Sequence, residues 1–252
     1  MKNAMENERE DIIEGRNAVI EALRAERAID KIFIAKGDTD KTLAHIASKA
    51  RELGCVVVDA DRRKLDSMSR TQSHQGVIAL AAVREYCSVA DILQIAKDRK
   101  EEPFVLVCDE ISDPQNLGAL IRTAEAAGLH GVVIPKRRSA SVSAVVHKTS
   151  AGAVEHIAVA RVPNIRAAIE ELKSAGLWVY GTAADGEESL WETNFSGPIC
   201  IVIGSEGSGI GRLIKESCDH LVFIPMLGKV SSLNASAAAA VLIYEALRQR
   251  LP

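Results

Sequence analysis

The sequence predicts an α/β protein of two domains, the larger of which contains a parallel sheet. Helical and strand patterns alternate along most of the 252 residues, and such alternation favours strands joined by crossover helices. Several strand patterns are short and apolar throughout, which is typical of strands buried on both faces of a sheet. A charged helical segment separates two blocks of these patterns. We therefore expect a small first domain over residues 1–83, a linker over 84–102 and a second domain over 103–252.

The first block contains both kinds of pattern in turn. Helices are expected near residues 15–27 and 40–53, and strands at 31–35, 55–58 and 76–81. This order indicates a small α/β unit. The segment that follows is helical and ends in a run of charged residues before Pro103, a composition typical of a connection between domains.

The second block opens with Phe104-Val105-Leu106-Val107-Cys108-Asp109, a short apolar run that ends on an acid. Strands of the same type are expected at four further places, residues 131–134, 177–181, 198–203 and 220–224. Helical patterns lie between most of them, which predicts a parallel sheet with crossover helices. The final helix is expected from Asn234 to Arg250, and its alanine-rich first half permits close approach of another backbone.

The composition excludes several classes of protein. Apolar residues make up 47% of the chain and charged residues 26%, so a wholly disordered chain is excluded. The N-terminus is polar and acidic, and no apolar run approaches the roughly 20 residues that span a bilayer. We expect a cytoplasmic protein with no membrane partner. The five cysteines lack close C-x-x-C pairs, so we expect reduced thiols and no metal site.

The charge pattern by itself identifies no partner. The net charge is −3, which does not indicate a nucleic acid. Two local triplets, Arg62-Arg63-Lys64 and Lys136-Arg137-Arg138, could each contact phosphates. A solvated surface explains either triplet equally well.

A first segment with candidate functional residues runs from Asp113 to Gly128, directly after the strand at 104–108. Pro114 and Asn116 favour a turn, and Gly118 lets the chain enter a helix tightly. Arg122 then lies further along that helix, where a guanidinium could clamp an anionic substrate. Pairing of Arg122 with Glu125 on the helix surface is an equally good interpretation.

A second segment, residues 203–211, follows the most apolar strand and has four glycines at 204, 207, 209 and 211. Glycines in this pattern leave backbone groups uncovered for a ligand. A dinucleotide fingerprint belongs in the first βα turn of its fold, with an acid about 20 residues later, whereas this loop lies near the end of the chain. The loop also lacks the Lys-Ser/Thr pair of a triphosphate-binding P-loop.

A third segment, residues 224–238, joins the last strand to the final helix. Pro225 and Gly228 favour a loop, and Ser232 or Asn234 can cap the helix. The helix N-terminus would also present free N–H donors to a ligand.

Together the three segments resemble the SpoU branch of the SPOUT methyltransferases. The family pattern has Asn then Arg in the first segment, Gly-x-Glu-Gly-x-Gly in the second and Ser-Leu-Asn in the third, and all are present in this order. Lys148-Thr149-Ser150-Ala151-Gly152-Ala153 also matches. The resemblance covers residues 104–250. More weakly, Gly15-Arg16-Asn17-Ala18-Val19 and His74-Gln75-Gly76-Val77 resemble the two ends of the substrate-binding domain in the subgroup that methylates a 23S rRNA guanosine.

The resemblance implies a fold, a cofactor and partners. The second domain would contain a deep trefoil knot, and the first would be similar to ribosomal proteins that bind RNA kinks. S-adenosylmethionine would lie in a cleft made by five residues, Gly204, Ile224, Leu233, Met226 and Thr182. A homodimer is implied, because family members complete the active site at a subunit interface. The substrate would be 23S rRNA or a large-subunit precursor.

The resemblance also implies roles for five catalytic candidates. Arg122 would stabilise the alkoxide that develops on the ribose oxygen, since a guanidinium is a poor base at neutral pH. Asn116 and Asn234 would hold Arg122 or the ribose, Glu206 would orient Arg122, and Ser232 would contact the substrate. For Glu206, a charge at a dimer interface is a competing interpretation.

Three alternatives remain open at this point. The same catalytic domain serves tRNA ribose methylation and drug-resistance methylation of rRNA. A non-catalytic RNA-binding protein would not require Asn116, Arg122, Glu206, Ser232 and Asn234 together. A nicotinamide-dependent enzyme is disfavoured by the position of the glycine loop.

Overall fold

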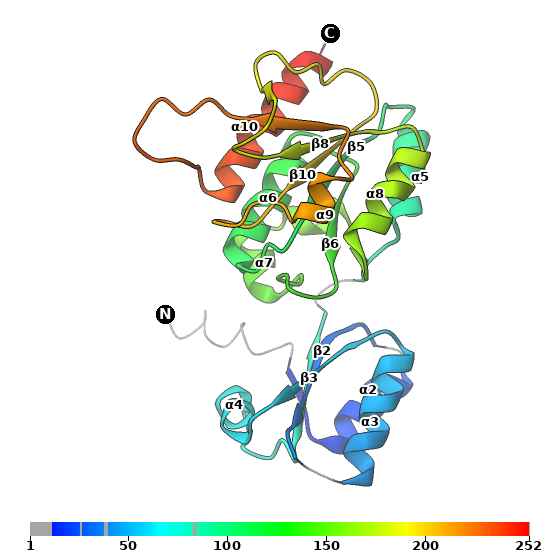
Figure 1. Cartoon of the computed structure of the whole chain (residues 1–252). Coiled ribbons are helices and arrows are strands. Elements are labelled where there is room, and N and C mark those ends of the chain that lie inside the picture. The colour runs from blue at the N-terminus through cyan, green and yellow to red at the C-terminus, as the bar shows by residue number, and fades with distance from the viewer. Residues whose placement is uncertain (1–11, 26, 38–39, 83–84, 252) are drawn as a thin grey trace. The chain divides into compact units, whose positions relative to one another are not determined.

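The structure is a computed structural model that describes residues 12–25, 27–37, 40–82 and 85–251. The chain divides into two compact units, Met1–Glu85 and Tyr86–Pro252, which are considered separately (Figure 1). Within those described ranges, no helix is both long and apolar enough to cross a membrane.

The first unit is a four-stranded sheet with helices on both faces. The strand order is β1-β4-β2-β3, in which β2 pairs parallel with β3 and the other two pairings are antiparallel. Apolar residues alternate along β2: Ile32 and Ile34 pack with α2 and α3, whereas Phe33 packs with α4 on the other face. The elements are β1 (Ile12–Glu14), α2 (Arg16–Arg24), β2 (Ile29–Ala35), α3 (Lys41–Glu52), β3 (Val56–Ala60), α4 (Arg62–Met68) and β4 (Val77–Ala81).

The second unit is built on a seven-stranded parallel sheet with the order β7-β6-β5-β10-β8-β11-β9. Its strands are β5 (Phe104–Cys108), β6 (Gly131–Pro135), β7 (Ala158–Val162), β8 (Trp178–Thr182), β9 (Glu188–Ser189), β10 (Ile199–Ile203) and β11 (His220–Phe223). Its helices are α5 (Val89–Arg99), α6 (Pro114–Ala126), α7 (Ala144–Thr149), the 3₁₀ turn η1 (Ala153–Glu155), α8 (Ile165–Ser174), α9 (Arg212–Lys215) and α10 (Ala235–Arg250).

Helices cover both faces of this sheet, and the apolar alternation of its central strands explains why. Along β5, Leu106 and Cys108 pack under α6, α7 and α10, whereas Val105 and Val107 pack under α5 and α8. Figure 1 shows α6, α7 and α10 on one face and α5 and α8 on the other. The fully buried strand β10 lies between β5 and β8 and pairs parallel with both. The loops that follow these three strands therefore emerge at the same edge of the sheet.

The α/β fold predicted from the sequence is confirmed, and so are the five predicted strands of the second unit. Three strands were missed. β7 is an edge strand that carries Arg161, β9 has two residues and β1 has three, so none has a long apolar signature. The knot implied by the resemblance stays a prediction.

The segment predicted as a linker contains α5. Ser88 and Asp91 form a capping box at its start, and Val89, Ile92 and Ala96 are buried against the second sheet or its helices. A Cβ on Gly131 of β6 would lie 2.5 Å from Ile92, so this helix packs on the sheet at short range. The domain limits 1–83, 84–102 and 103–252 stay predictions.

The cysteines carry no disulfide in the described chain: all five are free thiols. Cys108 and Cys200 are fully buried in strands β5 and β10, and burial raises the pKa of the Cys108 thiol to about 12. Such thiols pack as small apolar side chains and are unreactive at neutral pH.

Close packing between α6 and α7 fixes the start of α6, where Asn116 lies. The helix begins at the Asp113 cap, which accepts a hydrogen bond from the Gln115 N–H at 3.1 Å, with Pro114 in the first turn. Gly118 faces α7 so tightly that a Cβ there would lie 1.9 Å from the Thr149 Oγ1. Only glycine fits at this contact without movement of one helix.

We expect Gly118→Ala to lower the free energy of unfolding by about 1–3 kcal/mol, because the added methyl group overpacks the α6–α7 contact. Urea unfolding followed by circular dichroism measures this change. Gly228→Ala is the control, since no atom lies within 4 Å of a Cβ there, and its stability should stay within about 0.5 kcal/mol of the wild type. Equal stability of both variants would contradict the tight contact.

Candidate functional site

A cavity of about 720 Å³ opens at the carboxyl ends of β8, β10 and β11. Its walls come from the glycine loop after β10, the segment after β8 and the loop between β11 and α10. The five residues predicted to hold a cofactor all line it: Thr182, Gly204, Ile224, Met226 and Leu233. Three catalytic candidates line it as well: Glu206, Ser232 and Asn234. The structure thus brings the second and third sequence segments together, and the roles of these residues stay predictions.

The glycine loop is a tight backbone turn. The Ser205 and Gly209 backbones exchange two hydrogen bonds of 3.1 and 2.9 Å, and Gly207 and Gly209 have φ values of 88° and 65°. Left-handed φ values of this kind favour glycine. The Ser205 and Ser208 hydroxyls lie 2.6 Å apart and close the turn from the side.

Gly204 is required for a different reason, which is close backbone approach. A Cβ at this position would lie 2.0 Å from the Gly209 carbonyl carbon and 2.1 Å from the Ile210 nitrogen. The strand exit therefore packs directly on the backbone of the loop that follows it. Any side chain at position 204 would push the loop away from the cavity.

Three polar side chains from distant parts of the chain meet at the cavity edge. The Asn234 Nδ2 donates to the Asn116 Oδ1 at 3.0 Å and also to the Glu206 Oε1. The Asn116 Nδ2 donates to the same Glu206 oxygen at 3.2 Å. Glu206 is therefore held by two amides, and the three predicted segments are joined at this point.

Asn234 is also the cap of α10. Its Oδ1 accepts hydrogen bonds from the Ser236 N–H at 2.9 Å and the Ala237 N–H at 3.3 Å. Of the two capping residues considered from sequence, Asn234 takes this role and Ser232 does not. One side chain thus fixes both the start of the final helix and the position of Glu206.

Arg122 stands apart from the other four catalytic candidates. It is exposed on α6 and does not line the cavity. In the part of the chain that the structure describes, it forms no hydrogen bond or ion pair, so the alternative pairing with Glu125 is not formed. The separation of Arg122 from Asn116 follows from helix geometry. Six residues move Arg122 about 9 Å along the helix axis and turn its side chain about 120° around that axis.

Sequence reasoning gave no role to Asp109, the acid at the end of β5. Its carboxylate is buried and accepts the Gly211 N–H at 2.8 Å, which anchors the far end of the glycine loop. Burial raises the pKa of this carboxyl, the Gly211 hydrogen bond lowers it, and nearby Glu110 adds to the rise. The signal in the sequence was an apolar strand that ends on an acid.

Lys215 and Asp185 form a second missed feature at the rim of the same cavity. Both residues line the cavity, and the Lys215 Nζ lies 2.6 Å from the Asp185 Oδ1. This hydrogen bond lowers the pKa of the Asp185 carboxyl. The pair links α9 to the segment after β8, and no sequence motif marks it.

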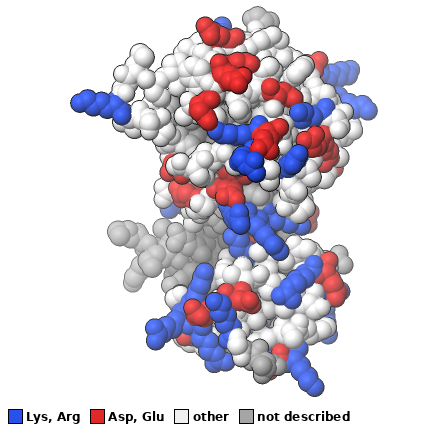
Figure 2. Space-filling model, in the orientation of Figure 1, with Lys and Arg blue, Asp and Glu red and all other residues white. Residues whose placement is uncertain are grey.

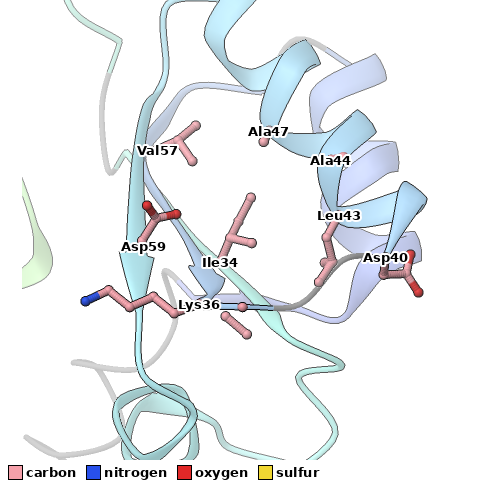
Figure 3. Close-up of a pocket in the computed structure, with 10 residues that line it drawn as sticks. Ile34, Lys36, Asp40, Leu43, Ala44, Ala47, Val57 and Asp59 are labelled. Atoms are coloured by element: carbon pink, nitrogen blue, oxygen red, sulfur yellow. The ribbon is translucent and has the colours of Figure 1, made fainter.

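The first unit has hollows of a different kind. One of about 260 Å³ lies between β2, β3 and α3, with Ile34, Leu43 and Val57 on its walls (Figure 3). The Asp40 carboxylate at its end is bound by Arg16 and caps α3. Among the described residues of both units, no group of three or more His, Cys, Asp or Glu side chains is placed to hold a metal ion.

Comparison with known families matches both units. The profile of the SpoU rRNA Methylase family matches residues 103–244, which is more than half of the 252 residues. The profile described as RNA 2'-O ribose methyltransferase substrate binding matches residues 12–87. Together the two matches span most of the chain.

Individual proteins are similar over the same extent. YacO of Bacillus subtilis strain 168, named as a TrmH family tRNA/rRNA methyltransferase, is 45% identical over 246 residues that cover 98% of each protein. The AdoMet-bound rRNA methyltransferase from Sinorhizobium meliloti has a TM-score of 0.61 and 25% identity, covering 100% of this chain and 92% of its own. A structure described for 2-OH methylation of C/U34 on tRNA has a TM-score of 0.54 and 29% identity, covering 59% of this chain and 96% of its own.

We expect Asn234→Ala to lower the free energy of unfolding by about 1 kcal/mol, because α10 loses its cap. Asn234→Ser is the matched control: serine keeps a capping oxygen and loses only the amide that holds Glu206, so it should lose less stability than the alanine variant. Chemical denaturation of the three proteins measures the order. An alanine variant as stable as the serine variant would show that the cap contributes nothing.

Proposed function

This chain belongs to the SpoU family of RNA methyltransferases, and on that premise we propose that it methylates the ribose 2′-hydroxyl of a guanosine in 23S rRNA, using S-adenosylmethionine. The observation that carries the proposal is the cavity, which is lined by eight residues predicted from the sequence: Thr182 and seven residues of the second and third segments. We propose that the reaction takes place in the cytoplasm, where the RNA and the methyl donor are both present.

The cavity fits the proposed cofactor in size and chemistry. A volume of about 720 Å³ lies within the usual range for a small-molecule site. The uncovered backbone of the glycine loop offers N–H and C=O groups, and Ile224, Met226 and Leu233 offer apolar surface beside them. The close approach at Gly204 leaves no room for a side chain at that position. When bound, S-adenosylmethionine supplies an electrophilic methyl group.

The side chains around the cavity would align the ribose and stabilise charge. Asn116 and Asn234 hold the Glu206 carboxylate in place, and Glu206 in turn would orient the guanidinium of Arg122. The positive charge of that guanidinium would stabilise the alkoxide as it develops. The proton would pass to an RNA phosphate or to water. Ser232, exposed at the cavity, would contact the RNA.

Because Arg122 lies outside the cavity of its own chain, we propose that a homodimer completes the site. The exposed face of α6 would present Arg122 to a second copy. Apolar side chains on the loop between β11 and α10 support this proposal: Leu227 is fully exposed and Val230 is 69% exposed, on a loop that projects from the unit in Figure 1. Burial of such residues favours association.

The first unit favours rRNA as the substrate over tRNA. The rRNA methyltransferase from Sinorhizobium meliloti is matched over 100% of this chain, whereas the protein described for tRNA methylation covers 59%. The first unit also matches a family described as substrate binding. An enzyme that carries this added unit would use it to select a larger RNA.

The proposal is tested by methyl transfer from radiolabelled S-adenosylmethionine to unmodified 23S rRNA, followed by mapping of the modified nucleotide. We expect label on the 2′-oxygen of one guanosine. Unmodified tRNA serves as the parallel substrate, and label on tRNA alone would replace rRNA with tRNA as the substrate. Calorimetry that finds tight NAD binding and no S-adenosylmethionine binding would end the methyltransferase proposal.

We expect Arg122→Ala to reduce methyl transfer by at least about 100-fold, because the alkoxide loses its stabilising charge. The Kd for S-adenosylmethionine should not change, since Arg122 does not line the cavity. Single-turnover kinetics and calorimetry measure the two quantities. Arg122→Lys, which keeps the charge but not the planar fork, should recover part of the rate. Unchanged turnover of the alanine variant would remove Arg122 from the reaction.

A fragment of residues 86–252 should fold, bind S-adenosylmethionine with the full-length Kd and methylate 23S rRNA poorly, because it keeps the cavity and loses the first unit. The fragment must start before α5, since Ile92 packs on the second sheet. A fragment that starts at residue 101 should therefore be less stable. Full rRNA activity of the 86–252 fragment would show that the first unit is not needed for recognition.

A further inference from the structure

We propose that a polar hollow in the first unit binds one phosphate-linked nucleotide of the substrate RNA, with arginines at its phosphate and glutamine amides at its base edge. The inference rests on the proposed function and names the surface through which the first unit would select RNA. The hollow has a volume of about 650 Å³, and its polar lining includes Arg16, Arg62, Gln72, His74 and Gln75.

The hollow lies where the two sequence motifs of the first unit meet. Gly15 and Val77 are joined by a backbone hydrogen bond of 3.3 Å. The Arg16 N–H donates to the Gln75 Oε1 at 3.2 Å, and the Arg16 Nε donates to the Gln75 carbonyl at 3.0 Å. The two motifs, joined here through residues that lie 59 positions apart in the chain, therefore form a single wall of the hollow.

The loop of residues 69–76, which supplies Gln72, Ser73, His74, Gln75 and Gly76 to the lining, is held in place by hydrogen bonds to one carboxylate. The Glu14 carboxylate accepts the Arg70 N–H at 3.2 Å, the Thr71 N–H at 3.1 Å and the Ser69 hydroxyl. These hydrogen bonds lower the pKa of Glu14 against the opposing effect of burial. The Glu14 carboxylate therefore holds the first residues of this loop in place.

Two glutamines of this loop adopt backbone conformations that non-glycine residues rarely adopt. Gln72 has a φ of 59° and Gln75 a φ of 50°. Such conformations persist where surrounding contacts determine them, and they are concentrated at functional sites. Both residues line the hollow. The Gln72 Nε2 donates to the Asp66 carbonyl at 3.3 Å and the Gln75 Oε1 accepts the Arg16 N–H, so the Gln72 Oε1 and the Gln75 Nε2 are the amide atoms offered to a base edge.

His74 forms the buried base of the loop. Its Nδ1 accepts the Gly76 N–H at 3.0 Å, so its Nε2 carries the proton and donates to the Asp66 Oδ1 at 2.9 Å. The ring is 6% exposed. One Asp66 oxygen is thus bound by His74, while the Asp66 side chain stays 54% exposed at the hollow.

Arginine chemistry favours a phosphate as the ligand. Arg16 uses its Nε for Gln75 and an Nη1 donor for Asp40, which leaves three of the five guanidinium donors that an arginine carries. Arg62, an exposed residue at the start of α4, is followed by Arg63 and Lys64. Figure 2 shows basic side chains gathered over the part of the first unit where Figure 1 places α4.

The lining distinguishes this hollow from the apolar one in Figure 3. The hollow between β2, β3 and α3 is lined mainly by aliphatic side chains together with Lys36, Asp40 and Asp59, whereas this one is lined by charged, imidazole and amide side chains and by the loop backbone. An open, cationic and polar hollow suits a single-stranded RNA nucleotide, which presents a phosphate and an edge of hydrogen-bonding groups. An apolar cofactor would find no matching surface there.

The test uses the full-length protein, unmodified 23S rRNA transcript and the Arg62→Ala variant. We expect the KM for RNA to rise roughly tenfold, as for loss of a hydrogen bond to a charged group, with kcat and the Kd for S-adenosylmethionine unchanged. The slope of log K against log salt should fall by about 1, since one phosphate contact is lost. Arg51→Ala, which removes an exposed arginine of α3 outside the hollow, is the matched control and should leave KM unchanged.

A second measurement does not depend on turnover or on a substitution. Transcript that contains 4-thiouridine is cross-linked to the wild-type protein by ultraviolet light, and tryptic peptides are identified by mass spectrometry. We expect cross-links on the peptide that spans residues 71–84. If the wild type methylates RNA but Arg62→Ala has an unchanged KM and this peptide carries no cross-link, the inference is overturned.

Failure of the proposed function gives a different result. A wild-type protein that methylates neither rRNA nor tRNA contradicts the methyltransferase proposal. In that case cross-links on residues 71–84 still support the hollow as an RNA site, and their absence overturns it.

Discussion

The site depends on the hydrogen bonds that one side chain, that of Asn234, forms in two directions. Its oxygen caps α10, and its nitrogen donates both to Glu206, 28 residues earlier, and to Asn116, 118 residues earlier. Asn116 is half-buried and Glu206 and Asn234 are exposed, so these hydrogen bonds act mainly by fixing the positions of the three side chains. Loss of register in any one of the three segments would leave Glu206 without the amides that hold it at the cavity edge.

The parallel sheet makes this meeting possible. β10 lies between β5 and β8, so the loops after β5, β8 and β10 leave the sheet at one edge. Glycine then permits two close approaches, one between Gly204 and the loop that follows it and one between Gly118 and Thr149. The buried Asp109 carboxylate, which accepts the Gly211 N–H, holds the end of the same loop. The geometry of the cavity therefore depends on backbone packing as much as on side chains.

The two units divide the proposed task. The second holds the cavity and the polar network, and the first presents a cationic hollow built from a separate pair of motifs. Recognition of RNA by phosphate contacts gives position, and contacts to base edges give selectivity. In the proposed arrangement, Arg16 and Arg62 would make the phosphate contacts and two glutamine amides would make the base-edge contacts. The first unit would thereby determine which nucleotide receives the methyl group.

The sequence by itself determined the elements and the motifs, because these depend on local spacing. The apolar run at 104–108, the glycine pattern at 204–211 and the start of the final helix at Asn234 were all predictable. The edge strand β7 was not, because its two alanines are weak strand formers and Arg161 interrupts its apolar run.

Only the tertiary structure decided which motif residues meet. It placed Asn116, Glu206 and Asn234 in contact, added Asp109 beneath the loop and left Arg122 exposed on α6. The physical reason is that contacts between residues far apart in the chain depend on strand order and helix packing. Local residue patterns determine the strands and helices, and they do not determine that order.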